Sequence, residues 1–533
     1  MKKKLIPYEQ TGYFSQITLH YLARQQQLHP FYQHNFTLEG FEQAAKSVQK
    51  KTYQREELVS VLTKQYQGFN TPPQVSANIR ALKQPDTFAI VTGHQPCLFT
   101  GPLYFIYKIV SAINLSELLN AACPHYRFVP VYWMGSEDHD FEEINHIHIF
   151  GKTLTWQQPR RTATGRLHTQ TIAPVIDEFK TLAGNTENSQ YLLHLFTHAY
   201  LHHNTLAEAT RYVVNELFGK LGLVVVNQDD AALKQLFAPI AHAELFETRS
   251  YELVQQTNRQ LSDFGYTNQA YARPINLFYL TDDFRERVVR SANGNQFEVL
   301  NTGLHFTGAQ IETELQQHPE RFSPNVILRP VYQQLVLPAV AYIGGGGELA
   351  YWLQLQSVFD LYGVNYPVLV LRNSVMWIDS PVWNKMKQLG LQPDALFTDT
   401  DALVNAFVAE NSRHRLNFEP QKQQIQQVFD QILQQAIAVD PTLQASVLAE
   451  TTKLTNSFEA LEAKILRAEK RKFDTSVQQI RNIFGRLFPN GTLQERHDTF
   501  SAFYLQHGSQ FIETLVQNLN PMEKQFTVLF PES

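Results

Sequence analysis

Cysteine is nearly absent from this chain: its 533 residues include only Cys97 and Cys123. Two cysteines provide neither a disulfide framework nor a thiolate cage for a metal, and they fit a reducing compartment. We expect Cys123 to be a small buried residue. Cys97 lies within a loop motif described below and is a candidate reactive thiol.

Long hydrophobic runs and a strong charge of one sign are also missing. The longest apolar stretch, Leu335 to Leu353, is interrupted by four glycines and Glu348, so it does not resemble a transmembrane helix. The chain starts with a basic segment, Met1 to Lys4, but Pro7 interrupts the apolar region that would have to follow it in a secretory signal. We therefore expect no such signal. The formal net charge of -5 gives no electrostatic reason for nucleic-acid binding. We therefore expect a cytoplasmic protein that binds neither membranes nor nucleic acid.

Hydrophobic residues make up 43% of the chain and charged residues 18%, so a globular α/β protein of about three structural units is expected. The patterns predict a parallel-sheet core that is interrupted by inserted modules. The expected parts are an N-terminal helical lead-in packed on the core (1–86), the core in three pieces (87–150, 221–243 and 326–400), two connecting insertions (151–220 and 244–325), a coiled-coil domain (401–488) and a C-terminal return segment (489–533).

The stretch 89–122 organises the core, because an apolar run, a glycine-punctuated loop and a helix follow one another directly. Phe88 to Thr92 predicts a buried parallel strand, and Thr100 and Pro102 are expected as the N-cap and first-turn proline of the helix. Free N–H groups at such a helix start favour an anion, so the candidate substrate- or anion-binding residues are Gly93, Gln95, Thr100 and Gly101. The loop matches neither a dinucleotide fingerprint nor a P-loop, and an ordinary turn stays an alternative.

An acidic cluster follows the second predicted strand, Arg127 to Met134. It lies at a strand's carboxyl end, where open α/β sheets bind ligands. Asp138 and His139 are therefore candidates for substrate binding or proton exchange, and a solvated turn is the alternative. Side chains alternate between faces along a strand, so the cluster does not form one metal site, and we predict no protein-held metal. The histidines between His194 and His203 lack a metalloprotease pattern.

A four-glycine loop, Gly344 to Gly347, is the second signal for a ligand site. It lies between a predicted strand and a predicted helix that begins at Glu348, and glycines let a ligand approach the backbone. The candidate residues are Gly345, Gly346 and Glu348, with a flexible turn as the alternative. The next predicted strand ends at Arg372, a natural cation for a carboxylate or phosphate.

Apolar residues recur at three-four spacing between Glu419 and Phe488, with a break at Asp440 and Pro441. This pattern predicts two antiparallel helices, and the second arm would be roughly 60 Å long. Glutamine and lysine fill the other positions. We expect the hairpin to project from the core and to form a homodimer.

Three sequence blocks together resemble the BshC family of bacillithiol biosynthesis. They are TGHQPCLFTGPLYFIYK (92–108), VPVYWMGSEDHDFEEIN (129–145) and RPVYQQLVLPAVAYIGGGGELAYWLQL (329–355). The resemblance extends along nearly the whole chain, although the family often has Gln at the position of His94. It implies a Rossmann-like core, similar to class I synthetases and nucleotidyltransferases, followed by a coiled-coil dimerisation element.

The resemblance also implies an activity: the addition of cysteine to glucosaminyl malate, an amide-forming ligase reaction that gives bacillithiol. Amide formation from a carboxylate is uphill in water, so ATP is the expected activator, with ATP or ADP as the bound nucleotide and Mg²⁺ only as its companion. Asp138, His139 and His94 are then the catalytic candidates. The family's nucleotide pocket maps onto Arg372, Asn373, Ser374, Gln494, Glu495 and Tyr504. The sequence has no KMSKS string, the lysine loop with which class I synthetases bind the phosphates of ATP. The alternatives are an inactive nucleotide-binding dimeric scaffold and a nucleotidyltransferase acting on another small acid.

Overall fold

The computed structural model describes residues 1–532 except 159–161, 292–293, 295 and 415–417. These gaps fall in the two predicted insertions and in the predicted coiled-coil region, and the expectations for them lie outside the described residues. The chain forms two compact units. The larger comprises 5–376 and 494–527, and the smaller comprises 1–4, 377–493 and 528–533. The boundary falls within β1 (Lys2–Pro7), β14 (Val375–Trp377) and β15 (Gln525–Phe530).

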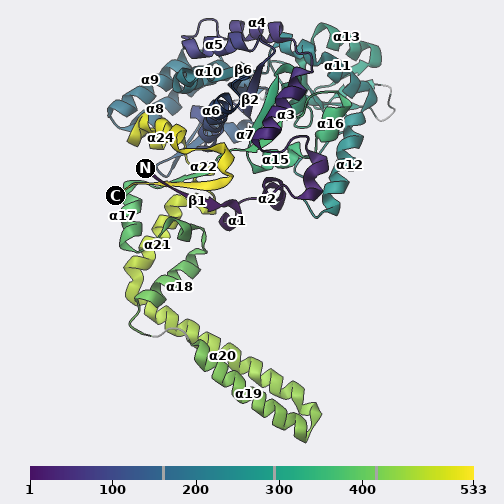
Figure 1. Cartoon of the computed structure of the whole chain (residues 1–533). Coiled ribbons are helices and arrows are strands. Elements are labelled where there is room, and N and C mark those ends of the chain that lie inside the picture. The colour runs from purple at the N-terminus through teal and green to yellow at the C-terminus, as the bar shows by residue number, and fades with distance from the viewer. Residues whose placement is uncertain (159–161, 292–293, 295, 415–417, 533) are drawn as a thin grey trace. The chain divides into compact units, whose positions relative to one another are not determined.

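A five-stranded parallel sheet forms the centre of the larger unit (Figure 1). Its spatial order is β13-β12-β2-β3-β6, which in chain order is 5-4-1-2-3, the order of a Rossmann-like fold. The predicted α/β class and the predicted strands are confirmed. Their observed bounds are β2 (Thr87–His94), β3 (Arg127–Met134), β6 (Val224–Asn227), β12 (Ala339–Gly344) and β13 (Val368–Leu371).

The strand order reverses between β2 and β12, and the register places their carboxyl ends at one edge. Ile343 pairs with Thr92, and His94 pairs with Met134 of β3. Ligands bind at such a reversal in open α/β sheets, because the connections leave it in opposite directions and open a crevice. The central sheet therefore predicts a ligand site beside His94.

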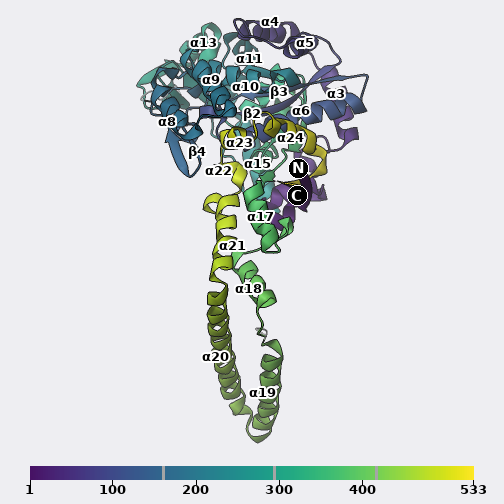
Figure 2. The ribbon, with the colours of Figure 1, turned by 90° about the vertical axis from the view of Figure 1, so that its left-hand side faces the viewer.

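Helices cover both faces of this sheet (Figures 1 and 2). The N-terminal segment contributes α1 (Tyr8–Thr11), α2 (Gln16–Leu22), α3 (Leu38–Gln49), α4 (Arg55–Gln65) and α5 (Pro73–Ala81). Helix α3 packs Phe41 and Val48 into the same core as Phe88 and Val340 of the sheet. Helix α6 (Tyr104–Ala122) connects β2 to β3 and is buried almost all round, which fits its nearly uniform apolar sequence.

Two insertions interrupt the βα alternation. The first contains α7 (Phe141–Ile144), the hairpin of β4 (His146–Ile149) and β5 (Lys152–Thr155), α8 (Ala173–Ala183), α9 (Glu187–Leu201) and α10 (Leu206–Phe218). The second follows α11 (Ala231–Glu247) and α12 (Arg249–Asp263) as an antiparallel sheet of order β10-β9-β8-β7-β11. Its strands are β7 (Leu277–Leu280), β8 (Arg285–Arg290), β9 (Gln296–Val299), β10 (Leu304–Thr307) and β11 (Phe322–Pro324), with α13 (Gly308–Gln317) between the last two.

The last part of the core contains α14 (Arg329–Val336), α15 (Gly346–Trp352) and α16 (Gln356–Leu361), and the C-terminal segment contains α22 (Gln494–His497), α23 (Phe500–His507) and α24 (Gln510–Asn518). The single helix expected from Glu348 is in fact two short helices, and the first begins earlier, at Gly346. No helix of the described residues is long and apolar enough to cross a membrane.

The smaller unit contains the expected helical hairpin of α19 (Glu419–Val439) and α20 (Gln444–Lys470), which contact each other. Helix α21 (Asp474–Leu487) continues the second arm after a short 3-10 turn. The main segment of the smaller unit begins at Trp377, whereas the sequence pattern places the start of the coiled-coil domain at residue 401. The reason is that α17 (Ser380–Gln388) and α18 (Thr400–Asn411) both contact α21.

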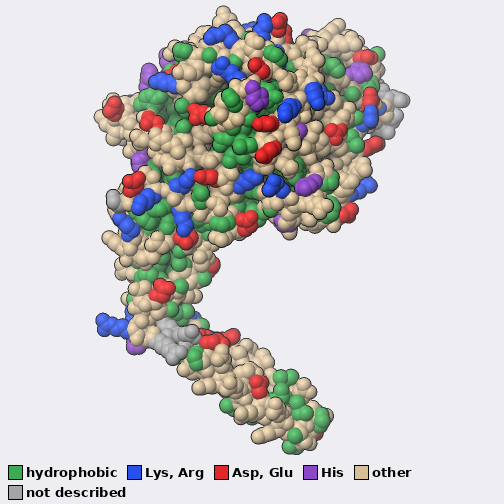
Figure 3. Space-filling view, viewed as in Figure 1, with side chains coloured by type: hydrophobic (Ala, Val, Ile, Leu, Met, Phe, Trp, Pro, Cys, Tyr) green, Lys and Arg blue, Asp and Glu red, His purple; other side chains and the backbone are tan. Residues whose placement is uncertain are grey.

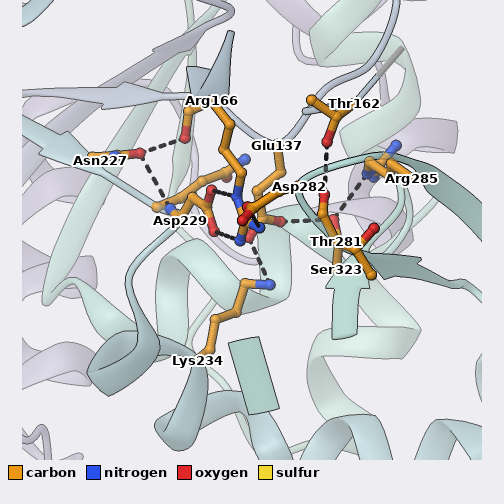
Figure 4. A network of polar contacts seen from close by, with 12 residues as sticks. Glu137, Thr162, Arg166, Asn227, Asp229, Lys234, Thr281, Asp282, Arg285 and Ser323 are labelled. Atoms are coloured by element: carbon orange, nitrogen blue, oxygen red, sulfur yellow. Dashed lines mark hydrogen bonds and ion pairs between the residues drawn. The ribbon is translucent and has the colours of Figure 1, made fainter. Parts of the chain in front are cut away.

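A buried ion pair joins the parallel sheet to the antiparallel insertion (Figure 4). Lys234 Nζ of α11 lies 2.6 Å from the Glu137 carboxylate, and neither side chain is exposed. Ser323 Oγ of β11 donates to the same carboxylate at 2.7 Å, and Lys234 Nζ donates to Phe322 O at 2.8 Å. Because both charges are shielded from water, each depends on the other for its stability.

Replacing Lys234 by methionine should destabilise the protein, because it leaves the Glu137 carboxylate buried without a counter-charge. We expect the free energy of unfolding to fall by ~3–5 kcal/mol, measured by thermal and urea denaturation of the full chain. The control is the double variant E137Q/K234M, which lacks both charges of this pair and should recover most of the loss. Equal destabilisation of the single and double variants would contradict this account.

Candidate functional site

A cavity of about 280 Å³ lies at the carboxyl edge of the sheet, where the strand order reverses. Residues that follow β2, β3 and β12 meet there: Gly93 to Gln95, Gly135 with Asp138, and Glu348. Helix α14 adds Arg329 and Gln333. The walls are largely aromatic, formed by Tyr104, Trp133, Tyr342, Tyr351 and Trp352. The cavity therefore combines apolar walls with a few charged groups, as small-molecule sites do.

The structure brings together only part of the predicted substrate-binding set. Gly93, Gln95 and Glu348 line the cavity, together with the catalytic candidates His94 and Asp138. The remaining candidates do not line it: Thr100, Gly101, His139, Gly345 and Gly346. Gln95 also donates through Nε2 to the Glu143 carboxylate at 3.2 Å.

The predicted N-cap at Thr100 is wrong, because α6 begins at Tyr104 and has no side-chain cap. Thr100 instead ends a 3-10 turn, Leu98–Thr100, and positive φ angles occur at Phe99 (45°), Thr100 (71°) and the next residue, Gly101 (67°). The N–H of Leu103, just before the helix, donates to Asp498 O at 2.8 Å. A backbone carbonyl thus occupies part of the helix start that was expected to hold an anion.

Lys108 of α6 was not predicted as a site residue, although it is the one cation in a helix of apolar sequence. Its Nζ donates to Gly93 O at 2.5 Å and to Glu348 Oε2 at 2.6 Å. A single lysine in an apolar helix next to a strand end is a signal that could have predicted an ion pair at the site, because a buried charge requires a partner. Lys108 thus ties β2 to the start of α15.

Glu348 accepts hydrogen bonds from three directions. Besides Lys108, Tyr342 Oη donates to it at 2.6 Å, and the N–H of Gly345 donates at 2.8 Å, a contact that caps α15. Burial alone would raise its pKa, but Lys108 and these donors hold it below its usual value. The backbone of the glycine loop therefore donates to the Glu348 carboxylate. Glu348 lines the cavity, whereas Gly345 and Gly346 do not.

The Asp138 carboxylate accepts hydrogen bonds from Arg329 and from the N–H groups of His139 and Asp140. Its Oδ1 accepts the N–H of His139 at 2.8 Å, and its Oδ2 accepts a hydrogen bond from Arg329 Nη1 at 3.1 Å. Burial would raise its pKa, but Arg329 and Arg285 keep it well below the usual range. Asp138 is therefore ionised at neutral pH and orients Arg329, a role that competes with proton exchange.

His139 does not line the cavity and cannot accept a proton in this arrangement. Its Nδ1 accepts a hydrogen bond from Arg285 Nη1 at 2.8 Å, so in the neutral ring the proton is on Nε2. Burial and the Arg285 charge lower its pKa. The predicted proton-exchange role of His139 is therefore not compatible with its geometry.

His94 is the imidazole that lines the cavity. Its Nδ1 lies 2.9 Å from Gln95 O and donates to it, which leaves Nε2 as the acceptor. Burial and the nearby Lys108 charge lower the pKa of His94 to about 4. A neutral imidazole with one free lone pair is thus available to a ligand at neutral pH.

The predicted nucleotide-binding residues form a buried polar cluster, apart from Tyr504. Arg372 Nη2 pairs with Glu495 Oε1 at 2.7 Å, and Glu495 Oε2 accepts the N–H of Val375 at 3.0 Å. Arg372 also donates to Ser374 Oγ and to Asn373 O. The charge of Arg372, expected to be available to a carboxylate or phosphate, is already matched by Glu495.

The other members of that set also have partners within the protein. Asn373 accepts from Ser111 Oγ at 3.1 Å and donates to Asn520 O at 3.0 Å. Gln494 is buried on α22 beside Glu495, whereas the ring of Tyr504 stacks on Tyr191 at a centroid distance of 5.4 Å. Nucleotide binding by these residues stays a prediction. In the described part of the chain, no group of three or more His, Cys, Asp or Glu side chains could hold a metal ion.

Sequence comparison decides the family. Residues 1–373 match the model of the bacillithiol biosynthesis BshC N-terminal Rossmann-like domain, and residues 375–531 match that of the BshC C-terminal coiled-coil domain. The chain belongs to the BshC family. A Flavobacterium johnsoniae protein named "Putative cysteine ligase BshC" is 42% identical over 99% of this chain and 100% of its own length. A protein of the same name from Christiangramia forsetii is 41% identical over 99% of each chain.

A solved structure from Campylobacter jejuni, described as a "putative arginyl t-RNA synthetase", covers 84% of this BshC-family chain and 98% of its own. Its identity is 12% and its TM-score is 0.23, which is too low to support a structural inference. The cavity lies within the matched Rossmann-like domain, and the α19–α20 hairpin lies within the matched coiled-coil domain. The expected Rossmann-like core and coiled-coil domain are therefore confirmed.

Cys97 of this BshC-family chain should react slowly as a nucleophile. It is buried, and burial together with Glu143 raises its pKa to about 12. Alkylation requires the thiolate, so at pH 8 we expect iodoacetamide to label Cys97 in the folded protein roughly 1000-fold more slowly than in urea. Peptide mass spectrometry measures this rate, and a C123S variant isolates the Cys97 signal. Fast labelling of the folded chain would show that the thiol is activated.

Proposed function

We propose that this chain is a ligase that joins the carboxyl group of L-cysteine to the amine of glucosaminyl malate and so forms bacillithiol. The observation that supports this most strongly is the cavity at the reversal of the sheet in a chain of the BshC family. The cavity lining contains two cations, Lys108 paired with Glu348 and Arg329 paired with Asp138, and one neutral imidazole, His94. These groups suit substrates that carry both carboxylates and an amine.

Activation of the cysteine carboxyl is the step that requires a co-substrate. We propose ATP, because its hydrolysis free energy can drive amide formation through an acyl adenylate or an acyl phosphate. The amine then attacks the acyl carbon, the bond from that carbon to the activating oxygen breaks so that AMP or phosphate leaves, and the nitrogen releases one proton to solvent. This proposal includes nucleotide binding by the six predicted residues: Arg372, Asn373, Ser374, Gln494, Glu495 and Tyr504.

The roles of the cavity residues follow from their contacts. His94 Nε2 accepts a hydrogen bond from the attacking amine, because its other nitrogen is fixed by Gln95 O. Lys108 places positive charge beside Gly93 and Glu348, where it can stabilise the oxygen of the reacting carboxyl group. Glu348 holds Lys108 in place.

Incubating the full chain with glucosaminyl malate, cysteine and ATP should give bacillithiol, detected by mass spectrometry. Lys108→Met should lower kcat by roughly 100-fold, because one charged group that stabilises developing charge is removed. Lys180→Met, at an exposed position of α8, is the matched control and should keep full activity.

Two results would contradict the ligase assignment, and a third would contradict the assignment of the reaction to this cavity. Nucleotide binding without turnover would favour the inactive scaffold, and pyrophosphate release that does not require cysteine would favour a nucleotidyltransferase. Full activity of folded Lys108→Met would reject the cavity as the reaction site.

We also propose that the α19–α20 hairpin forms a homodimer. Hydrophobic side chains are exposed over this hairpin (Figure 3), including Val428 (52%), Ile432 (42%), Leu454 (40%) and Leu461 (52%). Exposed apolar stripes on paired helices favour association with another helical surface. A second copy supplies the same stripe on its own hairpin.

Light scattering should give twice the mass of the 61.3 kDa chain. The variant V428E/I432E should shift the protein to a monomer, because burying two carboxylates at an apolar interface is unfavourable. Gln423→Glu, at an exposed polar position of α19, is the control and should leave the dimer intact. A wild-type monomer at micromolar concentration would reject the proposal.

A further inference from the structure

Two arginines, Arg285 and Arg329, lie near Asp138 on the side of the cavity formed by β3 and α14. Asp138 lies between two guanidinium groups: Arg329 donates to it at 3.1 Å, and Arg285 lies close enough to lower its pKa further. The neighbouring carboxylate, Glu137, is already paired with Lys234 (Figure 4). Glu137 also acts on both arginines through its charge, and Asp229 acts on Arg285 in the same way.

Arg285 is not compensated by its own hydrogen bonds. It donates to three uncharged acceptors: His139 Nδ1 at 2.8 Å, Ser323 Oγ at 3.0 Å and Pro324 O at 3.1 Å. Its guanidinium also lies 3.8 Å from the ring centre of Phe278. Burial and repulsion from Arg329 lower the pKa of Arg285 to about 10.

Arg329 is the arginine of this pair that lines the cavity. Its side chain is 22% exposed, against 3% for the residue Arg285. Arg329 Nη1 donates to the Asp138 carboxylate, which also accepts a hydrogen bond from the N–H of His139. One helical turn further along α14, Gln333 also lines the cavity, and its buried Nε2 has no partner among the described residues. Residues four apart on a helix share one face.

We propose that Arg329, oriented by Asp138 and accompanied by Gln333, binds a carboxylate of the malyl group of glucosaminyl malate. This inference rests on the proposed ligase function and assigns one substrate group to one side of the cavity. A carboxylate there pairs with the guanidinium of Arg329 and accepts a hydrogen bond from Gln333 Nε2.

The choice of the malyl group over cysteine follows from what each carboxylate does in the reaction. The cysteine carboxylate loses its charge when it is activated, so a rigid cation bound to it would stabilise the ground state more than the transition state. The malyl carboxylates keep their charge throughout. The fixed guanidinium of Arg329 is therefore suited to a malyl carboxylate. Lys108, which lies beside Gly93, is the cation for the reacting carboxyl group of cysteine.

Calorimetric titration of the full chain with glucosaminyl malate and with its dimethyl ester tests this assignment. Wild type should bind the diacid about 10- to 100-fold more tightly than the ester, as expected for a charged hydrogen bond. In Arg329→Gln this difference should shrink to less than about threefold. Because the ratio is measured within each variant, a general loss of folded protein does not change it.

Asp138→Asn should give an intermediate ratio, since it keeps the guanidinium charge but loosens its orientation. Arg321→Gln, which removes an arginine paired with Glu314 elsewhere in the same unit, is the matched control and should keep the wild-type ratio. Steady-state kinetics should show a higher KM for glucosaminyl malate in Arg329→Gln and an unchanged KM for cysteine.

Two outcomes would overturn the inference while leaving the ligase function intact: an unchanged diacid-to-ester ratio in Arg329→Gln, or an effect confined to the KM for cysteine. Arg329-dependent binding of L-malate by a chain that does not bind glucosaminyl malate would support the carboxylate subsite and reject the proposed function. The two failures are thus distinguishable.

Discussion

The pairing of β12 with β2 determines where a ligand can bind in this protein. The two strands are neighbours in the sheet, although β2 ends at His94 and β12 begins only at Ala339. The intervening chain builds β3, β6 and both insertions before it returns to the opposite side of β2. The reversal places the cavity at this edge, and the Lys108–Glu348 ion pair joins its two sides.

Much of the fold could be predicted from local pattern. The strands of the central sheet are short, apolar and followed by glycine or polar residues, so the pattern places each close to its observed bounds. The helical hairpin is equally clear, because its three-four periodicity is interrupted once, at Asp440 and Pro441. The strands β8, β10 and β11 give no such signal, since none is a continuous apolar run and their pairing depends on distant contacts.

The candidate site could be predicted less completely, because it depends on contacts between residues far apart in the sequence. Asp138, His94 and Glu348 stand out because each lies at or just after the end of a predicted strand. Lys108 and Arg329 do not, because they lie on helices, and only the folded chain brings them to Glu348 and Asp138. The prediction for His139 fails because its neighbour Asp138 lines the cavity, whereas its own ring contacts Arg285.

The central claim is that substrate binds where the strand order reverses. A crystal structure of the full chain with glucosaminyl malate tests this most directly. We expect the ligand between β2, β3 and β12, with its amine beside His94 and a malyl carboxylate beside Arg329. Ligand bound at any other place, with this cavity left unchanged, would contradict the account.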